Sequence, residues 1–254
     1  MAGRLAAWST PEMLPAHAID AVVFDMGGVF MVPCPRRIGD ELTAAGIEHG
    51  LDGETAPGAH YAGVRAITDL LADRAVAEDD PTIWRHYDRR AFAHVGLTGD
   101  RLEAALEVRD RMRERSVWVW EHPLAANIAA FARIAGRVPV AIVSNNDGTA
   151  AEQCVRLGIC QIGAGPLTPV AAIVDSTVAQ VAKPDPAIFA PALAALDTDP
   201  ARTLYVGDTV HADVLGATAA GLPVVQLDPL DLHRDHDHWR LPDVGALADH
   251  LDVP

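Results

Sequence analysis

The chain is poor in cysteine, in aromatic side chains and in positive charge. Its 254 residues include three cysteines, 5% aromatic residues, and 20 lysines and arginines against 35 acidic residues. The net charge of −15 argues against a nucleic-acid partner, because a phosphate backbone needs a basic face to bind. The odd number of cysteines and the lack of a CxxC spacing predict reduced thiols and a cytoplasmic location.

Long apolar runs are also missing. The longest apolar stretches have the length of strands, which predicts no transmembrane helix and no membrane partner. Residues 1–8 hold one arginine and no apolar segment, so we expect no signal peptide, and residues 1–15 are expected to form a loose arm. Half of the chain is hydrophobic, enough for one large domain or for a core with a smaller insertion.

One apolar run ends abruptly on a carboxylate. Residues 21–24 read Ala-Val-Val-Phe, Asp25 follows, and Gly27 and Gly28 come next. This pattern predicts a buried strand that delivers Asp25 to the rim of a sheet, where glycines let the backbone approach a ligand. Asp25 is therefore a candidate nucleophile.

The second half of the chain alternates between short apolar runs and Ala- and Leu-rich segments. Such an alternation predicts a parallel α/β sheet with helices on both faces. The predicted strands are 138–143, 171–174, 203–206 and 223–227, and the predicted helices are 124–134, 149–157, 186–196 and 212–220.

The segment between the first strand and the alternating half has helical periodicity. We expect helices over 61–72, 83–93 and 102–115, with no convincing strand between them. The sequence thus predicts an α/β core made of residues 1–33 and 117–254, and a helical insertion of residues 34–116. Trp118 and Trp120, near the return to the core, are interpreted as packing groups.

Polar side chains follow several of the predicted strands. Ser144 and Asn145 end the second strand, Lys183 lies just before a helix, and Asp208 and Asp213 follow the run Leu-Tyr-Val-Gly. In open parallel sheets, ligands bind outside the carboxyl ends of the strands. These groups therefore predict a single site together with Asp25.

Taken in order, these four motifs resemble those of the haloacid dehalogenase-like hydrolase superfamily. The stretches 183–189 and 216–221 are especially similar to that family, and the insertion resembles its α-helical cap. The resemblance covers nearly the whole chain. It implies a Rossmann-like parallel sheet with an inserted helical cap, a Mg²⁺ cofactor, and a hydrolase acting on a small-molecule phosphate ester as a monomer or homodimer.

The resemblance also implies roles for the acidic residues. Asp25 would attack phosphorus and form an aspartyl-phosphate. Asp25, the backbone carbonyl of Gly27 and Asp208 would bind Mg²⁺. Asp213 would complete the metal site by orienting Lys183 or a metal-bound water.

The remaining motif residues would bind the phosphoryl group. Ser144 and the backbone amides near Gly28 and Asn145 would hold its oxygens. Lys183 would neutralise Asp25 and the charge that develops during the reaction.

Gly27 departs from the best-known pattern of the family, which has a second aspartate at that position (Asp-x-Asp). A general acid there contributes on the order of 10²–10⁴-fold to the rate, and glycine cannot act as one. Three explanations are open: a slow phosphatase, a substrate with a good leaving group, or an acid supplied by the cap. By residue type alone the cap candidates are His49, His60, His86 and His94, although packed or exposed histidines are the simpler interpretation.

Two other functions stay open beside a Mg²⁺-dependent phosphatase. A haloacid dehalogenase would use the same Asp25 on a carbon–halogen bond without a metal. The pair Asp208 and Asp213 favours phosphoryl chemistry, because a dehalogenase has no use for metal ligands there. The third alternative is a non-catalytic binding or regulatory protein on the same scaffold.

Two histidine features are interpreted as structural. The polar run 233–238, with three histidines, predicts a surface loop and not a metal site. His211, between the two acids of the last motif, is expected to make a structural hydrogen bond.

Overall fold

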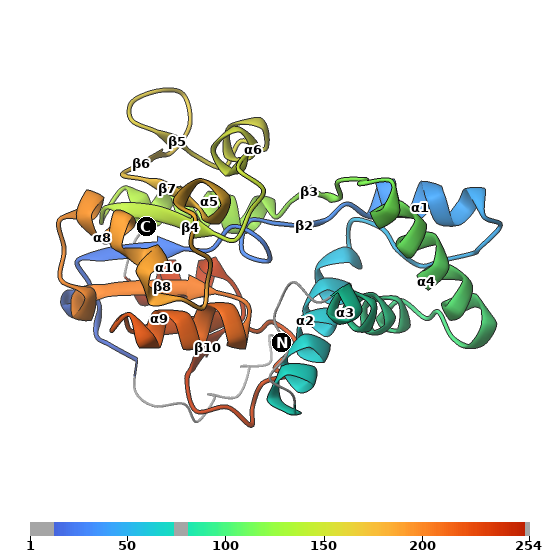
Figure 1. Cartoon of the computed structure of the whole chain (residues 1–254). Helices are drawn as coiled ribbons and strands as arrows, with labels where there is room; N and C mark the ends of the chain where they lie inside the picture. The colour runs from blue at the N-terminus through green and yellow to red at the C-terminus, as the bar shows by residue number, and fades with distance from the viewer. Residues whose placement is uncertain (1–12, 74–80, 252–254) are drawn as a thin grey trace, which may run out of the picture.

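A parallel sheet forms the centre of the computed structural model, which describes residues 13–73 and 81–251 (Figure 1). In this part of the chain the main sheet has six strands in the order β10-β9-β8-β1-β4-β7, and all neighbours pair in parallel. The strands are β1 (Ala21–Phe24), β4 (Val140–Ser144), β7 (Ile173–Asp175), β8 (Thr203–Gly207), β9 (Val224–Leu227) and β10 (Trp239–Leu241).

Strand β1 is buried on both of its faces. Val22 and Phe24 pack into one hydrophobic cluster, and Ala21 and Val23 pack into another. Side chains alternate between the faces of a strand, so each cluster corresponds to one layer of helices. This two-sided burial explains why β1 is apolar throughout, and the predicted α/β core is confirmed.

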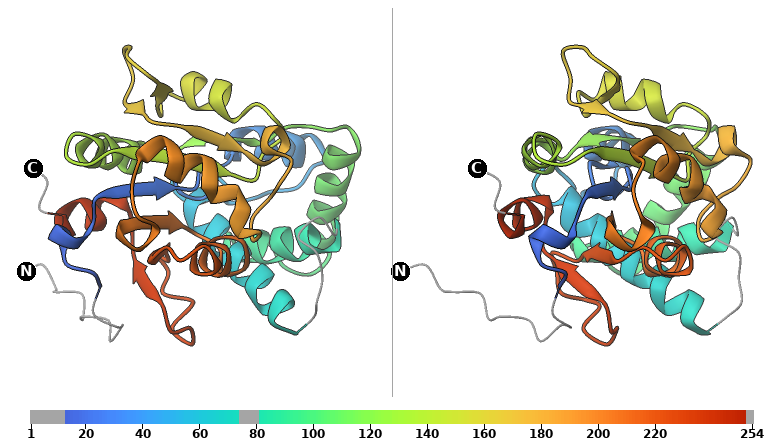
Figure 2. Two further views of the ribbon diagram at one scale, coloured as in Figure 1. Left: turned by 60° about the vertical axis from the view of Figure 1, so that its left-hand side comes forward. Right: turned by 90° about the vertical axis from the view of Figure 1, so that its left-hand side faces the viewer.

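Helices cover both faces of the sheet (Figure 2). Helices α5, α6 and α10 contribute to the first cluster, and η2, α8, η4 and α9 contribute to the second. Their bounds are α5 (Ala125–Ala135), α6 (Ala150–Arg156), the 3₁₀ turn η2 (Pro186–Phe189), α8 (Ala190–Leu196), the π-helical turn η4 (Val210–Leu215), α9 (Gly216–Ala219) and α10 (Val244–His250). The smaller elements are η1 (Ala16–Ala18), η3 (Pro200–Arg202), α7 (Ser176–Ala179) and the parallel pair β5 (Gln161–Ile162) and β6 (Pro169–Val170).

Four helices lie apart from the sheet, at the end toward which β1 points (Figure 1). We call α1 (Pro35–Ala44), α2 (Ala56–Asp73), α3 (Pro81–His94) and α4 (Gly99–Glu114) the cap. An antiparallel pair, β2 (Met31–Pro33) and β3 (Trp120–Pro123), joins the cap to the core. Among the described helices, none is long and apolar enough to cross a membrane.

Several elements were not predicted from the sequence, among them α1, β10 and α10. Helix α1 begins at Pro35, and proline at the first position of a helix is favourable, because its missing N–H has no partner there. Strand β10 has three half-buried residues, too few for a visible pattern. Helix α10 is short, and Asp243 caps its N-terminus by accepting a hydrogen bond from the amide of Ala246 at 2.8 Å.

The predicted surface loop over 233–238 is wrong in part. His233 is 2% exposed, and its backbone amide donates to Asp228 Oδ2 at 2.8 Å. Its Nε2 lies 3.1 Å from the hydroxyl of Thr68 in α2, and Arg65 in α2 pairs with Asp235 at 2.7 Å. The segment folds back on a buried carboxylate and contacts the cap, which the local composition did not indicate.

His238 in this segment predicts a pH-dependent stability. Burial, with His236 adding to it, lowers the pKa of His238 to about 4, while an unfolded histidine titrates near about 6.5. Between these values the unfolded chain binds more protons, so His238 stabilises the fold above about pH 6.5 and loses this contribution as the pH falls toward 4. Urea unfolding at pH 7 and pH 5 is expected to show a smaller loss of stability in His238→Gln than in the wild type.

The glutamine is a matched replacement, because its amide can still donate to Gln226 Oε1, which His238 Nε2 contacts at 2.7 Å. If both proteins lose the same free energy of unfolding between pH 7 and pH 5, His238 does not cause this pH dependence.

Candidate active site

Asp25 lies directly after β1, at the edge of the sheet that faces the cap. Its backbone amide donates to Val206 O at 2.8 Å, which continues the β1–β8 pairing by one residue. The chain then turns: Gly28 has a φ of 69°, and its amide donates to Met31 O at 2.7 Å. The Asp25 side chain is thus held at a strand end by backbone hydrogen bonds on both sides of it.

Gly28 is enclosed by side chains from both parts of the molecule. A Cβ atom at this position would lie 2.2 Å from Asp208 Oδ2 and 2.6 Å from His60 Nε2. The hydroxyl of Tyr61 in α2 donates to Gly28 O at 2.7 Å. Both the left-handed backbone and the lack of space therefore require glycine here.

Lys183 connects two of the acidic residues. Its Nζ lies 2.7 Å from Asp25 Oδ1, 2.7 Å from Asp213 Oδ1 and 3.0 Å from the hydroxyl of Tyr205. Burial alone would lower the pKa of Lys183, but Asp213 and Asp25 raise it above its usual value. Lys183 therefore stays charged and holds one Asp25 oxygen in place.

Asn145 fixes the backbone of Lys183. Its Oδ1 accepts from Lys183 N at 2.8 Å, and its Nδ2 donates to Lys183 O at 2.9 Å. The side chain thus has a positioning role that sequence analysis did not foresee. Substrate binding by the Asn145 and Gly28 amides stays a prediction. Ser144 ends β4, is 4% exposed and lines the same cavity as Asp25.

Asp213 has both oxygens occupied by donors. Oδ1 accepts from Lys183 Nζ and from the Tyr205 hydroxyl, each at 2.7 Å. Oδ2 accepts from the amides of Asp208 and Thr209 at 3.2 and 2.9 Å and from the Thr209 hydroxyl at 2.7 Å. Although burial opposes it, Lys183 holds the pKa of Asp213 below its usual value. This geometry supports orientation of Lys183 more directly than metal binding.

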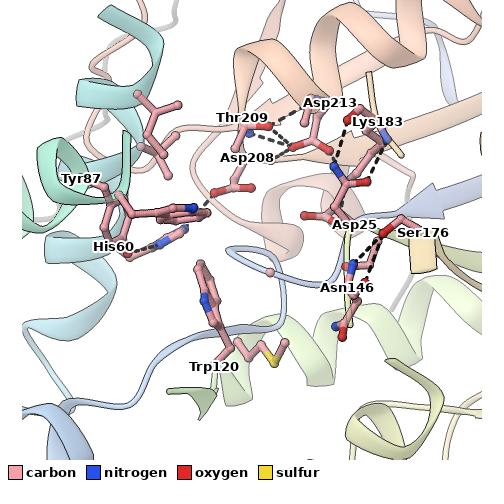
Figure 3. Close-up of a pocket in the computed structure, with 18 of the residues that line it drawn as sticks. Asp25, His60, Tyr87, Trp120, Asn146, Ser176, Lys183, Asp208, Thr209 and Asp213 are labelled. Atoms are coloured by element: carbon pink, nitrogen blue, oxygen red, sulfur yellow. Dashed lines mark hydrogen bonds and ion pairs between the residues drawn. The ribbon is translucent and has the colours of Figure 1, made fainter. Parts of the chain in front are cut away.

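His60, one of four cap histidines named by residue type alone, is the one that reaches the acids. It is 2% exposed, and its Nε2 lies 2.8 Å from Asp208 Oδ2 while its Nδ1 lies 2.8 Å from the Tyr87 hydroxyl (Figure 3). Its spacing was the available signal: His60, Val64 and Ile67 follow i, i+4, i+7 on α2 and all line the cavity. A histidine on an apolar helix face that points into a cavity needs a polar partner.

The three carboxylates suit a divalent cation. One oxygen from each of Asp25, Asp208 and Asp213 lies within 4.8 Å of the others, and all three side chains are buried. Burial raises the pKa of Asp25 to about 7 although Lys183 opposes the shift, and burial raises the pKa of Asp208 although its contact with His60 opposes the shift. Carboxylate oxygens are the donors that Mg²⁺ prefers, so the residues present fit a hard cation.

The acids open onto a cavity of about 460 Å³ between the core and the cap. Polar side chains from the core form one wall, and Figure 3 shows Asp25, Lys183 and Asp208 facing Trp120 and the cap across it. The opposite wall is apolar and aromatic. It is formed by Val64, Ile67, Ile83, Trp84, Tyr87, Trp118 and Trp120.

Gly27 lies beneath one of these tryptophans. A Cβ atom at Gly27 would be 3.5 Å from Cζ3 of Trp120 and 4.0 Å from Asp25 Oδ2. An aromatic ring therefore lies beside the position where the related pattern has its second acid. Trp118 and Trp120 are predicted to be packing groups; Trp120 does pack against two hydrophobic clusters, and both residues also line the cavity.

The other named histidines lie elsewhere. His49 Nε2 contacts Gly39 O at 3.1 Å within the cap, His86 is exposed, and His94 packs beside Gly58. His211 is half-buried and does not line the cavity. The predicted loose arm lies mostly outside the described residues.

Comparison with known sequences gives one family. The family model described as haloacid dehalogenase-like hydrolase matches residues 19–221. A phosphoserine phosphatase from Thermus thermophilus is 30% identical over 140 residues, which are 55% of this chain and 52% of the relative. The chain thus spans about half the length of this curated relative.

Solved structures share the fold at low sequence identity. HAD-hydrolase YfnB from Bacillus subtilis, bound to magnesium, has a TM-score of 0.56 at 14% identity and covers 92% of this chain and 99% of its own. The L-2-haloacid dehalogenase of Xanthobacter autotrophicus has a TM-score of 0.52 at 17% identity, with 92% and 98% covered. A predicted phosphoglycolate phosphatase from Haemophilus somnus has 0.51 at 15%, with 91% and 97% covered.

Proposed function

Because the chain belongs to the haloacid dehalogenase-like hydrolase family, we propose that it is a Mg²⁺-dependent phosphatase of a small phosphorylated compound. The observation that carries the proposal is the buried group of Asp25, Asp208 and Asp213 around Lys183. Its carboxylates exceed its lysine in charge, which favours a bound cation and an anionic phosphoryl group together. The name of the Thermus relative, phosphoserine phosphatase, also supports a phosphatase function.

Asp25 acts as the nucleophile in this proposal. Its free oxygen attacks phosphorus, the ester P–O bond breaks, and the alcohol leaves with a proton taken from water. Lys183 holds the other Asp25 oxygen at 2.7 Å and thus fixes the direction of attack. Water then attacks the aspartyl-phosphate, which releases inorganic phosphate and restores Asp25.

Asp25, the Gly27 carbonyl and Asp208 would hold the Mg²⁺. When bound, it would supply charge compensation that allows a carboxylate to approach a phosphoryl group. Asp213, which accepts from Lys183, would orient that lysine, and Ser144, which lines the cavity, would donate to a phosphoryl oxygen. The cytoplasmic location expected from the thiols stays a prediction; Cys34, Cys154 and Cys160 are buried and unpaired.

Metal removal tests the proposal. Phosphate release from acetyl phosphate is expected to fall to the uncatalysed rate in EDTA and to return when excess Mg²⁺ is added. Acetyl phosphate is a suitable substrate because it is small and needs no acid at position 27 to leave. Full activity in EDTA, or no turnover with Mg²⁺ present, would contradict a Mg²⁺-dependent phosphatase.

A second function is favoured by one specific observation. Gly27 and the apolar wall suit attack of Asp25 on a carbon–halogen bond, which needs neither a second acid nor a metal. Halide release from 2-chloropropionate in the presence of EDTA would support this dehalogenase. If no halide is released and phosphate release depends on Mg²⁺, the dehalogenase is excluded and the phosphatase function is supported.

A further inference from the structure

Among the described residues, the wall of the cavity opposite the acids carries no lysine or arginine. It is formed mainly by Val64, Ile67, Ile83, Trp84, Trp118 and Trp120. Among the described residues that line the cavity, Lys183 is the only lysine or arginine, and Asp25 and Asp213 both pair with it. In the described part of the chain, a second anionic group on the substrate would therefore meet no lysine or arginine on this side.

The polar atoms of His60, Tyr87 and Trp118 on the cap side have partners within the protein. His60 Nε2 contacts Asp208 and its Nδ1 contacts the hydroxyl of Tyr87. The indole N–H of Trp118 donates to Trp120 O at 3.0 Å. What these residues offer to a ligand is their apolar and aromatic surface.

The aromatic rings form a connected array above the nucleophile. Trp84 lies 5.6 Å from Tyr87 and 6.2 Å from Trp120, measured between ring centroids, and both contacts are edge-to-face. His60 lies 5.6 Å from Trp120 in the same type of arrangement. A flat apolar group fits such walls better than a flexible charged one, since aromatic contacts add to the gain from burial.

The lack of a side chain at position 27 extends this surface to the reacting atoms. Trp120 lies 3.5 Å from where a Gly27 Cβ would stand, and that Cβ would be 4.0 Å from Asp25 Oδ2. The part of the substrate attached to the ester oxygen would thus contact a ring and not a carboxyl group. The size of the cavity agrees with such a substrate, because a volume of about 460 Å³ accommodates a phosphoryl group and one ring-sized substituent.

We propose that the preferred substrate is the phosphate monoester of an uncharged aromatic alcohol, and not of a hydroxy acid or amino acid. This inference rests on the proposed phosphatase function. It distinguishes the chain from proteins named as phosphoserine or phosphoglycolate phosphatases, whose named substrates carry a carboxylate beside the ester.

The test compares 2-phenylethyl phosphate with phosphoglycolate and phosphoserine, using the full chain with Mg²⁺. All three release a primary alcohol, so the comparison isolates recognition of the substituent. The kcat/KM for 2-phenylethyl phosphate is expected to be higher by about tenfold or more. Calorimetry on Asp25→Asn is expected to show the same order of affinities without turnover.

Trp84 provides the specific variant. Trp84→Ala is expected to lower kcat/KM for 2-phenylethyl phosphate by about tenfold relative to kcat/KM for phosphoglycolate, and Trp84→Phe is expected to restore most of this selectivity. Thermal unfolding of both variants checks that they fold.

The outcomes separate the two proposals. If the wild type does not hydrolyse acetyl phosphate, the phosphatase function and this inference are both overturned. If it hydrolyses acetyl phosphate through Asp25 but prefers phosphoglycolate or phosphoserine to 2-phenylethyl phosphate, only the aromatic substrate class is overturned. Unchanged selectivity in a folded Trp84→Ala would likewise overturn it.

Discussion

Replacing Asp25 with asparagine is expected to reduce Mg²⁺-dependent phosphate release by about 10⁴-fold or more. An amide is a poor nucleophile, and it cannot form the acyl-phosphate through which the reaction would pass. The folded structure is expected to be kept, because asparagine has the same shape and removes one charge from three crowded carboxylates. Phosphate release and thermal unfolding, measured on the same preparation, check both expectations.

Asp249→Asn is the matched control for this variant. Its side chain is 75% exposed, pairs with Arg133 at 3.1 Å and does not line the cavity. The same chemical change there is expected to leave turnover unaltered. Substantial phosphatase activity in Asp25→Asn would exclude Asp25 as the nucleophile.

Gly28→Ala is expected to damage both stability and activity. The φ of 69° costs a non-glycine residue about 1–2 kcal/mol. The added Cβ would also fall 2.2 Å from Asp208 Oδ2, so Asp208 or the turn must move. We expect a total destabilisation of about 2–4 kcal/mol and a loss of activity of about 100-fold, since displacement of a catalytic group by 1 Å has effects of that size.

Gly158→Ala separates the cost of the left-handed backbone from the cost of the close contact with Asp208. Gly158 has a nearly equal φ of 70°, but a Cβ there would meet nothing within 4 Å. This variant is expected to show the backbone cost alone, with normal turnover. If urea unfolding gives equal losses for both variants and Gly28→Ala keeps full activity, the close contact with Asp208 has no functional consequence.

The residues at the strand ends could be predicted from the sequence because strand polarity fixes where they meet. Asp25, Ser144 and Asp208 each follow an apolar run, and parallel strands bring their carboxyl ends to one edge. The contacts of Lys183 could not be derived in this way. They depend on two hydrogen bonds between the Asn145 side chain and the Lys183 backbone, for which the sequence carries no local signal.

The cap contribution was harder to predict. His60 reaches Asp208 only because α2 packs against the strand ends, and the sequence cannot give that packing angle. Trp120 lies over Gly27 because β3 pairs with β2 across a register shift. In both cases the sequence shows the residue type, but the residue that it contacts belongs to a segment far away in the chain.

The position of β1 in the sheet has a consequence for how the protein is made. Val22 pairs with Val140 on one side and with Leu204 on the other. At a synthesis rate of roughly 5–20 residues per second, the second partner leaves the ribosome roughly 10–40 s after the first strand. The cap helices can form during this interval, while the apolar residues 21–24 have at most one of their two partner strands. We therefore expect the segment before the nucleophile to be the one most in need of chaperone protection in the nascent chain.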